Sequence, residues 1–175
     1  MPTYVPRIAD AEVTARLSYS GAVLIEGPRA CGKTSTALRL SGSQLLLDSS
    51  ADLRHSAELD PNGVLTGSNP RLVDEWQLVP SLWNAARRLI DNEQRDGLFI
   101  FTGSSVPADD AIRHSGAGRF SRYRMRPMTV FESGASVGDV SLAQLLNGDP
   151  GIAANAGLCA RDRIDRHPPG GRDST

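Results

Sequence analysis

Lysine is almost absent from this sequence, and cysteine and aromatic residues are scarce. Lys33 is the only lysine among 19 basic residues, so arginine carries nearly all the positive charge. Of the two cysteines, Cys31 lies in a glycine-rich loop, which argues against a structural disulfide with Cys159 and favours a reducing compartment. No apolar run approaches the length of a membrane span, and the N-terminus lacks the apolar segment of a secretion signal. We therefore expect a cytoplasmic protein that does not enter a membrane.

An excess of charge of one sign is also missing. The sequence has 19 basic and 20 acidic residues, and a net charge of -1 gives no general attraction to nucleic acid or to an anionic membrane. His55, His114 and His167 are scattered without the spacing of metal ligands, which argues against hydrolysis by a metal ion alone. With no internal repeat, the 175 residues suit one ordinary domain with a proper core.

Residues 27–34 read G-P-R-A-C-G-K-T and fit the phosphate-binding pattern G-x-x-x-x-G-K-[ST]. An apolar run at 22–25 predicts a buried parallel strand before the loop, and residues 34–40 predict a helix after it. In such a unit backbone N–H groups surround a phosphate, and the helix dipole favours its negative charge. Lys33 would contact the β- and γ-phosphates, and Thr34 would bind Mg²⁺. The residues predicted to contact the nucleotide are Gly27, Pro28, Arg29, Ala30, Cys31, Gly32, Lys33, Thr34 and Ser35.

Two adjacent carboxylates, Asp74 and Glu75, end a short predicted strand that begins near Pro70. Beside the phosphate-loop strand, such a strand would bring Asp74 to the carboxyl edge of the sheet, where ligands bind in open α/β folds. Asp74 then suits a Mg²⁺ ligand, directly or through water, opposite Thr34. Glu75 suits a base that polarises the attacking water. The alternative is that the two carboxylates form a solvated surface pair.

Other segments carry weaker predictions. The most apolar strand, 98–101, leads to Thr102, whose hydroxyl would reach the γ-phosphate or the attacking water, or else simply cap the strand. Arginines at 122, 124 and 126 alternate with Tyr123 and Met125, which predicts a strand with one basic face. We interpret that face as solvated or as contacting phosphate, since the balanced net charge disfavours nucleic-acid binding.

Helix boundaries and loops complete the prediction. Asp10 is expected to cap a first helix that ends near Ser18. Trp83 shares a helix face with apolar residues and is expected in the core. Residues 106–118 are expected to be mobile, residues 129–132 have the spacing of a capping box at the start of a helix, and residues 141–146 predict a last helical turn.

In this order, the phosphate loop, D-E-W-Q at 74–77, T-G-S-S at 102–105, G-R at 118–119 and a strand followed by Glu132 resemble the ATP-binding domain of a family of AAA-like ATPases from bacteria and archaea. The resemblance covers roughly residues 4–146. It implies an α/β P-loop NTPase fold whose parallel sheet has the strand order 5-1-4-3-2, flanked by helices. It implies that Asp74 and Glu75 are the acidic pair, Thr102 the sensor and Arg119 an arginine finger. The lead-in around Tyr4 would lie near the nucleotide base or merely pack.

The domain organisation predicted in this way is an ATP-binding domain at 1–147 followed by a disordered tail at 148–175. The tail is rich in Gly, Pro, Arg and Asp, and it has too few large apolar residues to offset its ordering entropy. Members of the family usually carry a second domain of unknown function there. We therefore expect a truncated product whose tail is not native.

The favoured function is Mg²⁺-dependent ATP binding with slow hydrolysis, with ATP and Mg²⁺ as cofactors and with room for self-association or a protein partner. The alternative is a non-hydrolysing nucleotide-binding or interaction module, a remnant of a longer two-domain ATPase. A GTPase is disfavoured, because the one lysine is used at position 33 and no N-K-x-D motif for reading guanine exists.

Overall fold

The computed structural model describes residues 4–103, 118–136 and 146–147. The chain forms two units, residues 1–128 and residues 129–175, which we treat separately. Ser104, Ser105, the segment 106–117 and the tail 148–175 lie outside the described residues, as does almost all of the helical turn predicted at 141–146.

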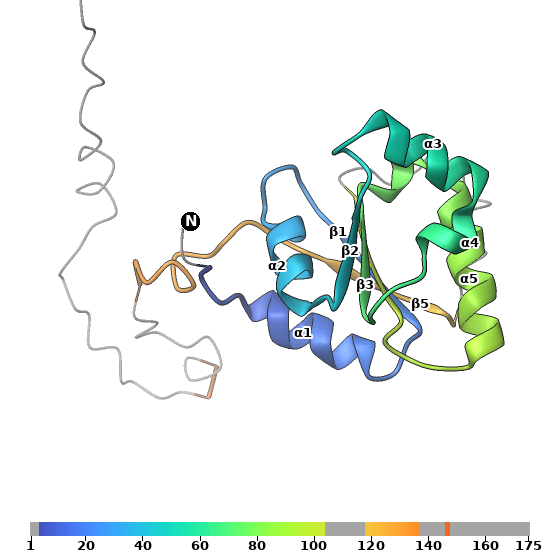
Figure 1. Cartoon of the computed structure of the whole chain (residues 1–175). Coiled ribbons are helices and arrows are strands. Elements are labelled where there is room, and N and C mark those ends of the chain that lie inside the picture. The colour runs from blue at the N-terminus through green and yellow to red at the C-terminus, as the bar shows by residue number, and fades with distance from the viewer. Residues whose placement is uncertain (1–3, 104–117, 137–145, 148–175) are drawn as a thin grey trace, which may run out of the picture. The chain divides into compact units, whose positions relative to one another are not determined.

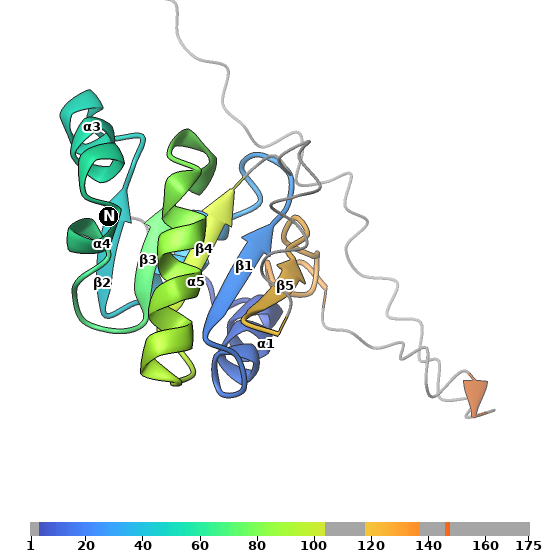
Figure 2. The same ribbon diagram turned by 90° about the vertical axis from the view of Figure 1, so that its right-hand side faces the viewer.

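A parallel sheet of five strands is the framework of the first unit (Figure 1). The strands lie in the order β2-β3-β4-β1-β5, which is the predicted order read from the opposite edge. Every neighbouring pair is parallel, so the carboxyl ends of all strands meet at one edge. Figure 2 shows the strands side by side in this order. The strands are β1 (Ala22–Glu26), β2 (Ser43–Leu46), β3 (Arg71–Asp74), β4 (Phe99–Gly103) and β5 (Phe120–Arg124).

Helices cover both faces of this sheet (Figure 1). On one face lie α1 (Ile8–Leu17) and α2 (Lys33–Leu40). On the other lie α3 (Ala51–Leu59), the single turn α4 (Pro61–Val64) and α5 (Ser81–Glu93). A short 3-10 helix, η1 (Trp76–Leu78), follows β3. This is the three-layer arrangement that parallel strands buried on both faces require.

The core has two parts, one on each face of the sheet. Alternate residues of β1 divide between them: Leu24 joins the cluster under α3–α5, and Val23 joins the cluster under α1 and α2. Rings gather in the first cluster, where the centroids of Trp83 and Phe120 lie 3.8 Å apart. Trp83 is buried, which confirms its predicted place in the core. Burial on both faces fixes the register of the central strands, and so fixes where each strand ends.

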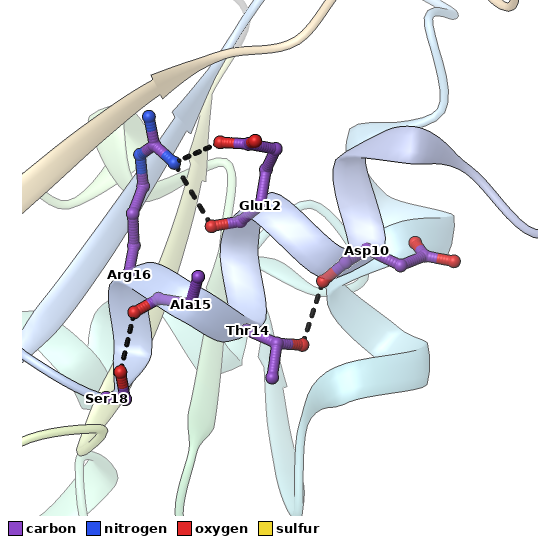
Figure 3. A network of polar contacts seen from close by, with 6 residues as sticks. All are labelled: Asp10, Glu12, Thr14, Ala15, Arg16 and Ser18. Carbon is purple, nitrogen blue, oxygen red and sulfur yellow. Dashed lines mark hydrogen bonds and ion pairs between the residues drawn. The ribbon is translucent and has the colours of Figure 1, made fainter.

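The start of α1 differs from the prediction. The helix begins at Ile8 with Arg7 at its cap, and Asp10 lies inside the first turn. The Asp10 carboxylate accepts the backbone N–H of Arg7 at 3.0 Å, so it closes the helix end from within rather than from the cap. Farther along, the Thr14 hydroxyl donates to the Asp10 carbonyl at 2.8 Å, and Arg16 pairs with Glu12 at 2.6 Å (Figure 3).

The described part of the second unit is a turn. The predicted capping box at 129–132 is present: the Glu132 carboxylate accepts the Thr129 N–H at 2.8 Å, and the Thr129 hydroxyl accepts the Glu132 N–H at 3.1 Å. Residues 130–134 nevertheless form turns instead of a helix. In none of the ranges that the structure describes is there a helix with the length and apolar character needed to cross a membrane.

Candidate functional site

The glycine-rich loop connects the end of β1 to the start of α2. Gly32 caps α2 with a left-handed backbone (φ +100), a conformation that costs glycine little. Gly27 is needed for a different reason. A Cβ at this position would lie 2.4 Å from the backbone oxygen of Met125, so only glycine lets the loop pass this close to the segment after β5.

Lys33 is the first residue of α2 and is only 6% exposed. Its ammonium donates to the carbonyl oxygens of Gly27 at 3.0 Å and Pro28 at 2.9 Å. Among the described residues, no carboxylate pairs with it. Neutral carbonyls offer a buried ammonium hydrogen bonds without a countercharge, so an anion entering the loop would stabilise it further.

Asp74 accepts hydrogen bonds from two hydroxyls. Thr34 Oγ1 lies 3.0 and 3.1 Å from the two carboxylate oxygens of Asp74, and the Thr102 hydroxyl donates to Asp74 Oδ1. Asp74 and Thr102 are register partners at the ends of β3 and β4, which explains their contact. Strand β4 separates β3 from β1, as in the predicted strand order, and Asp74 still lies at the carboxyl edge of the sheet. The link between the loop and Asp74 is made by Thr34, which stands on α2.

The charge state of Asp74 is set by opposing effects. Burial raises the pKa of the Asp74 carboxyl above its ordinary value of 3.8. The hydrogen bonds from Thr102 and Thr34 lower that pKa, and the nearby charges of Glu75 and Asp48 raise it, with a net upward shift. A carboxylate that is costly to ionise in this position would be stabilised by a bound cation.

Glu75 has a left-handed backbone (φ +53), which is uncommon for a residue with a side chain. This conformation ends β3 and begins η1. Glu75 lines the same pocket as Lys33 and Thr34, a cavity of about 520 Å³ at the carboxyl edge of the sheet. Strained residues of this kind gather at functional sites, where the surrounding structure holds them. The pocket is lined by Arg29, Ala30, Gly32, Lys33, Thr34, Ser35, Asp48, Glu75 and Leu78.

Asp48 was missed as a candidate, although the sequence held a signal for it. It follows β2 just as Asp74 ends β3, and the carboxyl ends of both parallel strands lie at one edge. Asp48 is exposed, lines the pocket, and contributes to the raised pKa of Asp74. The logic that selected Asp74 therefore applied equally to Asp48, two residues after the end of β2.

A smaller cavity of about 280 Å³ adjoins the first, because Gly32 and Ser35 line both. Tyr4 lies on its wall, and the phenol oxygen is within hydrogen-bond distance of Asp10 and of Thr36. Burial, followed by the hydrogen bond to Asp10, raises the pKa of Tyr4. The lead-in to α1 is therefore held against α2. The remaining lining residues are Val5, Arg7, Thr36 and Met128.

Arg7 was also missed, and it braces the glycine-rich loop. Its side chain is 8% exposed and donates to the carbonyl oxygens of Cys31 and Arg126, each at 3.0 Å. It therefore ties the loop to the segment that follows β5. Nothing local marks this role in the sequence, because the two acceptors stand 24 and 119 positions away.

The structure places Arg119 away from the pocket. Its carbonyl accepts the N–H of Ala22 at 3.0 Å, so it lies at the start of β1. The glycine-rich loop begins at the other end of that strand, roughly 13 Å away at about 3.3 Å per residue. The Arg119 side chain pairs with Asp91 at 2.7 Å. Within one chain, Arg119 and the loop therefore lie at opposite edges of the sheet.

A parallel sheet in this strand order, with a glycine-rich loop between a central strand and a helix, defines a P-loop nucleotide-binding protein. The chain belongs to the AAA domain family, which it matches over residues 19–133. It is similar to two uncharacterised proteins, one from Mycobacterium bovis and one from Mycobacterium tuberculosis. Each is 30% identical over 138 residues, which is 76% of this chain and 31% of the relative. The chain thus spans about a third of the length of the curated relatives it matches.

Proposed function

We propose that this domain binds ATP together with Mg²⁺ and hydrolyses it slowly. The observation that carries the proposal is the meeting of a buried ammonium and a hydroxyl–carboxylate pair at one edge of the sheet: Lys33 in the loop, and Thr34 bonded to Asp74. Membership of the AAA domain family supports the nucleotide. The small cavity beside Tyr4 and Thr36 is proposed to take the base.

The donor set fits Mg²⁺. A magnesium ion in a nucleotide site takes one or two protein oxygens and fills its remaining positions with phosphate oxygens and water. Thr34 and Asp74 offer a hydroxyl and a carboxylate about 3 Å apart, and Asp48 adds negative charge to the pocket wall. Within the described residues no group of three His, Cys, Asp or Glu residues could hold a metal ion, so phosphate and water would supply the other Mg²⁺ ligands. Bound Mg²⁺ would neutralise the charge that develops on the phosphate oxygens.

The remaining residues are proposed to act on hydrolysis. Glu75, on the pocket wall, would orient and polarise the attacking water. Thr102 commits its hydroxyl proton to Asp74, so it would sense the γ-phosphate through that carboxylate or by rotating away from it. Arg119 would serve only a second copy of the chain, because it lies at the far edge of its own sheet.

A second candidate function is nucleotide binding without hydrolysis. The observation that favours it is the position of Arg119 at the edge of the sheet opposite the glycine-rich loop. A P-loop site without an arginine finger retains its ground-state contacts and loses much of its transition-state stabilisation. A single-turnover assay separates the two functions: slow hydrolysis gives a measurable yield of ADP, and nucleotide binding without hydrolysis gives none.

The test of nucleotide binding is a calorimetric titration of Mg·ATP into the wild type and Lys33→Ala. Removing a charge-assisted phosphate contact worth about 1.5–3 kcal/mol should weaken binding by roughly tenfold or more. Arg95→Ala, at an exposed arginine after α5, is the control for loss of a cation and should bind like the wild type. Equal affinities for wild type and Lys33→Ala would contradict the proposal.

A further inference from the structure

The side chain of Gln77, which does not itself line the pocket, forms a hydrogen bond with the carboxylate of Glu75. It stands two residues later on η1, and its Nε2 donates to Glu75 Oε2. An ionised carboxylate only accepts hydrogen bonds, so the amide must turn its NH₂ group toward Glu75 and its oxygen the other way. That oxygen is buried and meets no hydrogen-bond donor among the described residues. A buried acceptor without a donor is unfavourable, so this orientation must be stabilised by the contact with Glu75.

Gly103 provides the space that the Gln77 amide occupies. A Cβ built on Gly103, the last residue of β4, would lie 2.7 Å from Gln77 Oε1 and 3.1 Å from Trp76 Nε1. Gly103 is not among the glycines with positive φ, so its backbone conformation is open to any residue. Space for its neighbours is therefore what glycine contributes here. The end of β4 is thereby connected through Gln77 to Glu75.

Glu75 needs such a contact. Its side chain starts from a left-handed backbone at the junction of β3 and a helix of only three residues. Hydrogen bonds such as the one from Gln77 restrict the rotamers that a glutamate side chain on a pocket wall can adopt. A residue that orients an attacking water must keep its carboxylate within a narrow range of positions.

We propose that Gln77 is a positioning residue that fixes the Glu75 carboxylate in the pocket, and that Gly103 leaves the room this requires. The inference rests on the proposed function, since it takes Glu75 to act on the attacking water. It predicts that Gln77 affects the rate of hydrolysis and leaves the affinity for nucleotide unchanged.

The first experiment measures single-turnover hydrolysis and Mg·ATP affinity in Gln77→Met and Gly103→Ala. Methionine keeps the length of the side chain and loses the N–H₂ donor. Alanine at 103 displaces the Gln77 amide without touching Glu75, and the atom it meets is the end of a flexible side chain. Each variant should slow hydrolysis by about tenfold or more, because the carboxylate is misplaced, and should bind Mg·ATP within about twofold of wild type.

Two further variants sharpen this test. The double variant Gln77→Met/Gly103→Ala should be no slower than the slower single variant, because both changes act through the same amide. Gln44→Met, at an exposed glutamine on β2, should hydrolyse ATP like the wild type. A wild-type rate in Gln77→Met, additive losses in the double variant, or a loss of affinity as large as the loss of rate would each overturn the inference.

A second measurement separates this inference from the proposed function. Urea unfolding of the wild type, Gln77→Met, Glu75→Ala and the double variant Glu75→Ala/Gln77→Met gives the coupling energy between the side chains of Glu75 and Gln77 without nucleotide. A coupling of at least about twofold in the unfolding constant supports the contact even if the wild type hydrolyses nothing, in which case the proposed hydrolysis alone fails. Additive changes in stability would overturn the role of Gln77 whatever the rate of hydrolysis.

Discussion

Thr102 and Asp74 are register partners on β4 and β3, and the Thr102 hydroxyl donates to the Asp74 carboxylate, which also accepts from Thr34. Three elements that are distant in sequence, β3, β4 and α2, therefore meet at one buried acid. This acid accepts hydrogen bonds from two hydroxyls but is buried away from water, which raises its pKa. Its ionisation therefore opposes folding, and a bound cation would stabilise the ionised form.

Replacing Asp74 by asparagine should stabilise the protein at neutral pH in the absence of metal. Burial raises the pKa of Asp74 above 3.8, so the folded state holds this proton more tightly than the unfolded state. Below the unfolded value the acid is neutral in both states and there is no penalty. As the pH rises through the raised folded pKa, ionisation increasingly opposes folding. Asp74→Asn should therefore gain more stability over wild type at pH 7.5 than at pH 4.

Urea unfolding in the presence of a chelator measures that difference. Asp96→Asn, at an exposed aspartate, controls for the loss of one negative charge. A stability difference between Asp74→Asn and wild type that is the same at both pH values would show that ionisation of Asp74 does not oppose folding.

The two adjacent acids should give different phenotypes. Asp74→Asn should lose most of the Mg²⁺-dependent part of ATP affinity, since it removes a carboxylate that bonds to Thr34. Glu75→Gln should bind Mg·ATP like the wild type and hydrolyse it at least about a hundredfold more slowly, as loss of a general base predicts. Calorimetry with and without Mg²⁺, paired with single-turnover assays, checks both. The same phenotype in both variants would argue against separate roles.

Arg7→Met should destabilise the protein and weaken nucleotide binding. The change leaves the carbonyls of Cys31 and Arg126 without their donor, which should lower the free energy of unfolding by about 1–3 kcal/mol. Arg95→Met, at an exposed arginine after α5, should stay within about 0.5 kcal/mol of wild type. Chemical denaturation compares the two. If Arg7→Met were as stable as Arg95→Met, the brace between the loop and residue 126 would be of no energetic consequence.

Local patterns predicted most of the fold, including the glycine-rich loop between β1 and α2. The strand–loop–helix unit around Lys33 was readable because its glycines, apolar run and helix start are neighbours in sequence, and the strand order followed from the family resemblance. The burial of Trp83 followed from helix periodicity. The strand–loop–helix unit and the burial of Trp83 depend on residues within a few positions of one another, where a pattern has direct physical meaning.

Features set by tertiary contacts were missed. The left-handed backbone of Glu75 has no glycine to mark it in the sequence, and it occurs at the junction of β3 and η1. Asp10 resembles a helix cap in sequence, but the cap position is taken by Arg7, whose side chain donates to the carbonyl of Cys31 in the loop. Asp10 lies in the first turn and accepts the backbone N–H of Arg7 from there. Arg119 matched a family pattern in order along the chain, and order along the chain does not say at which edge of the sheet a residue lies.

Arg119 should affect hydrolysis only between copies of the chain. It lies at the edge of the sheet opposite the glycine-rich loop and pairs with Asp91, so it has no route to its own pocket without rearrangement of β5. If it acts as a finger on a neighbouring copy, the specific rate should rise with protein concentration. Arg119→Ala should abolish that rise, lowering the assembled rate by up to roughly 10³-fold. Arg122→Ala, a nearby arginine on β5 that pairs with Glu26, should keep it.

Mixing two inactive variants gives the sharpest form of this prediction. Lys33→Ala retains Arg119 and lacks the phosphate contact, and Arg119→Ala retains the pocket and lacks the finger. In a mixed assembly, some pockets of Arg119→Ala chains receive Arg119 from a Lys33→Ala neighbour, so hydrolysis should reappear on mixing. Steady-state assays over a range of concentrations and mixing ratios measure this. A rate that is independent of concentration, unaffected by Arg119→Ala and not restored by mixing would mean that Arg119 has a structural role on its own chain, where it pairs with Asp91.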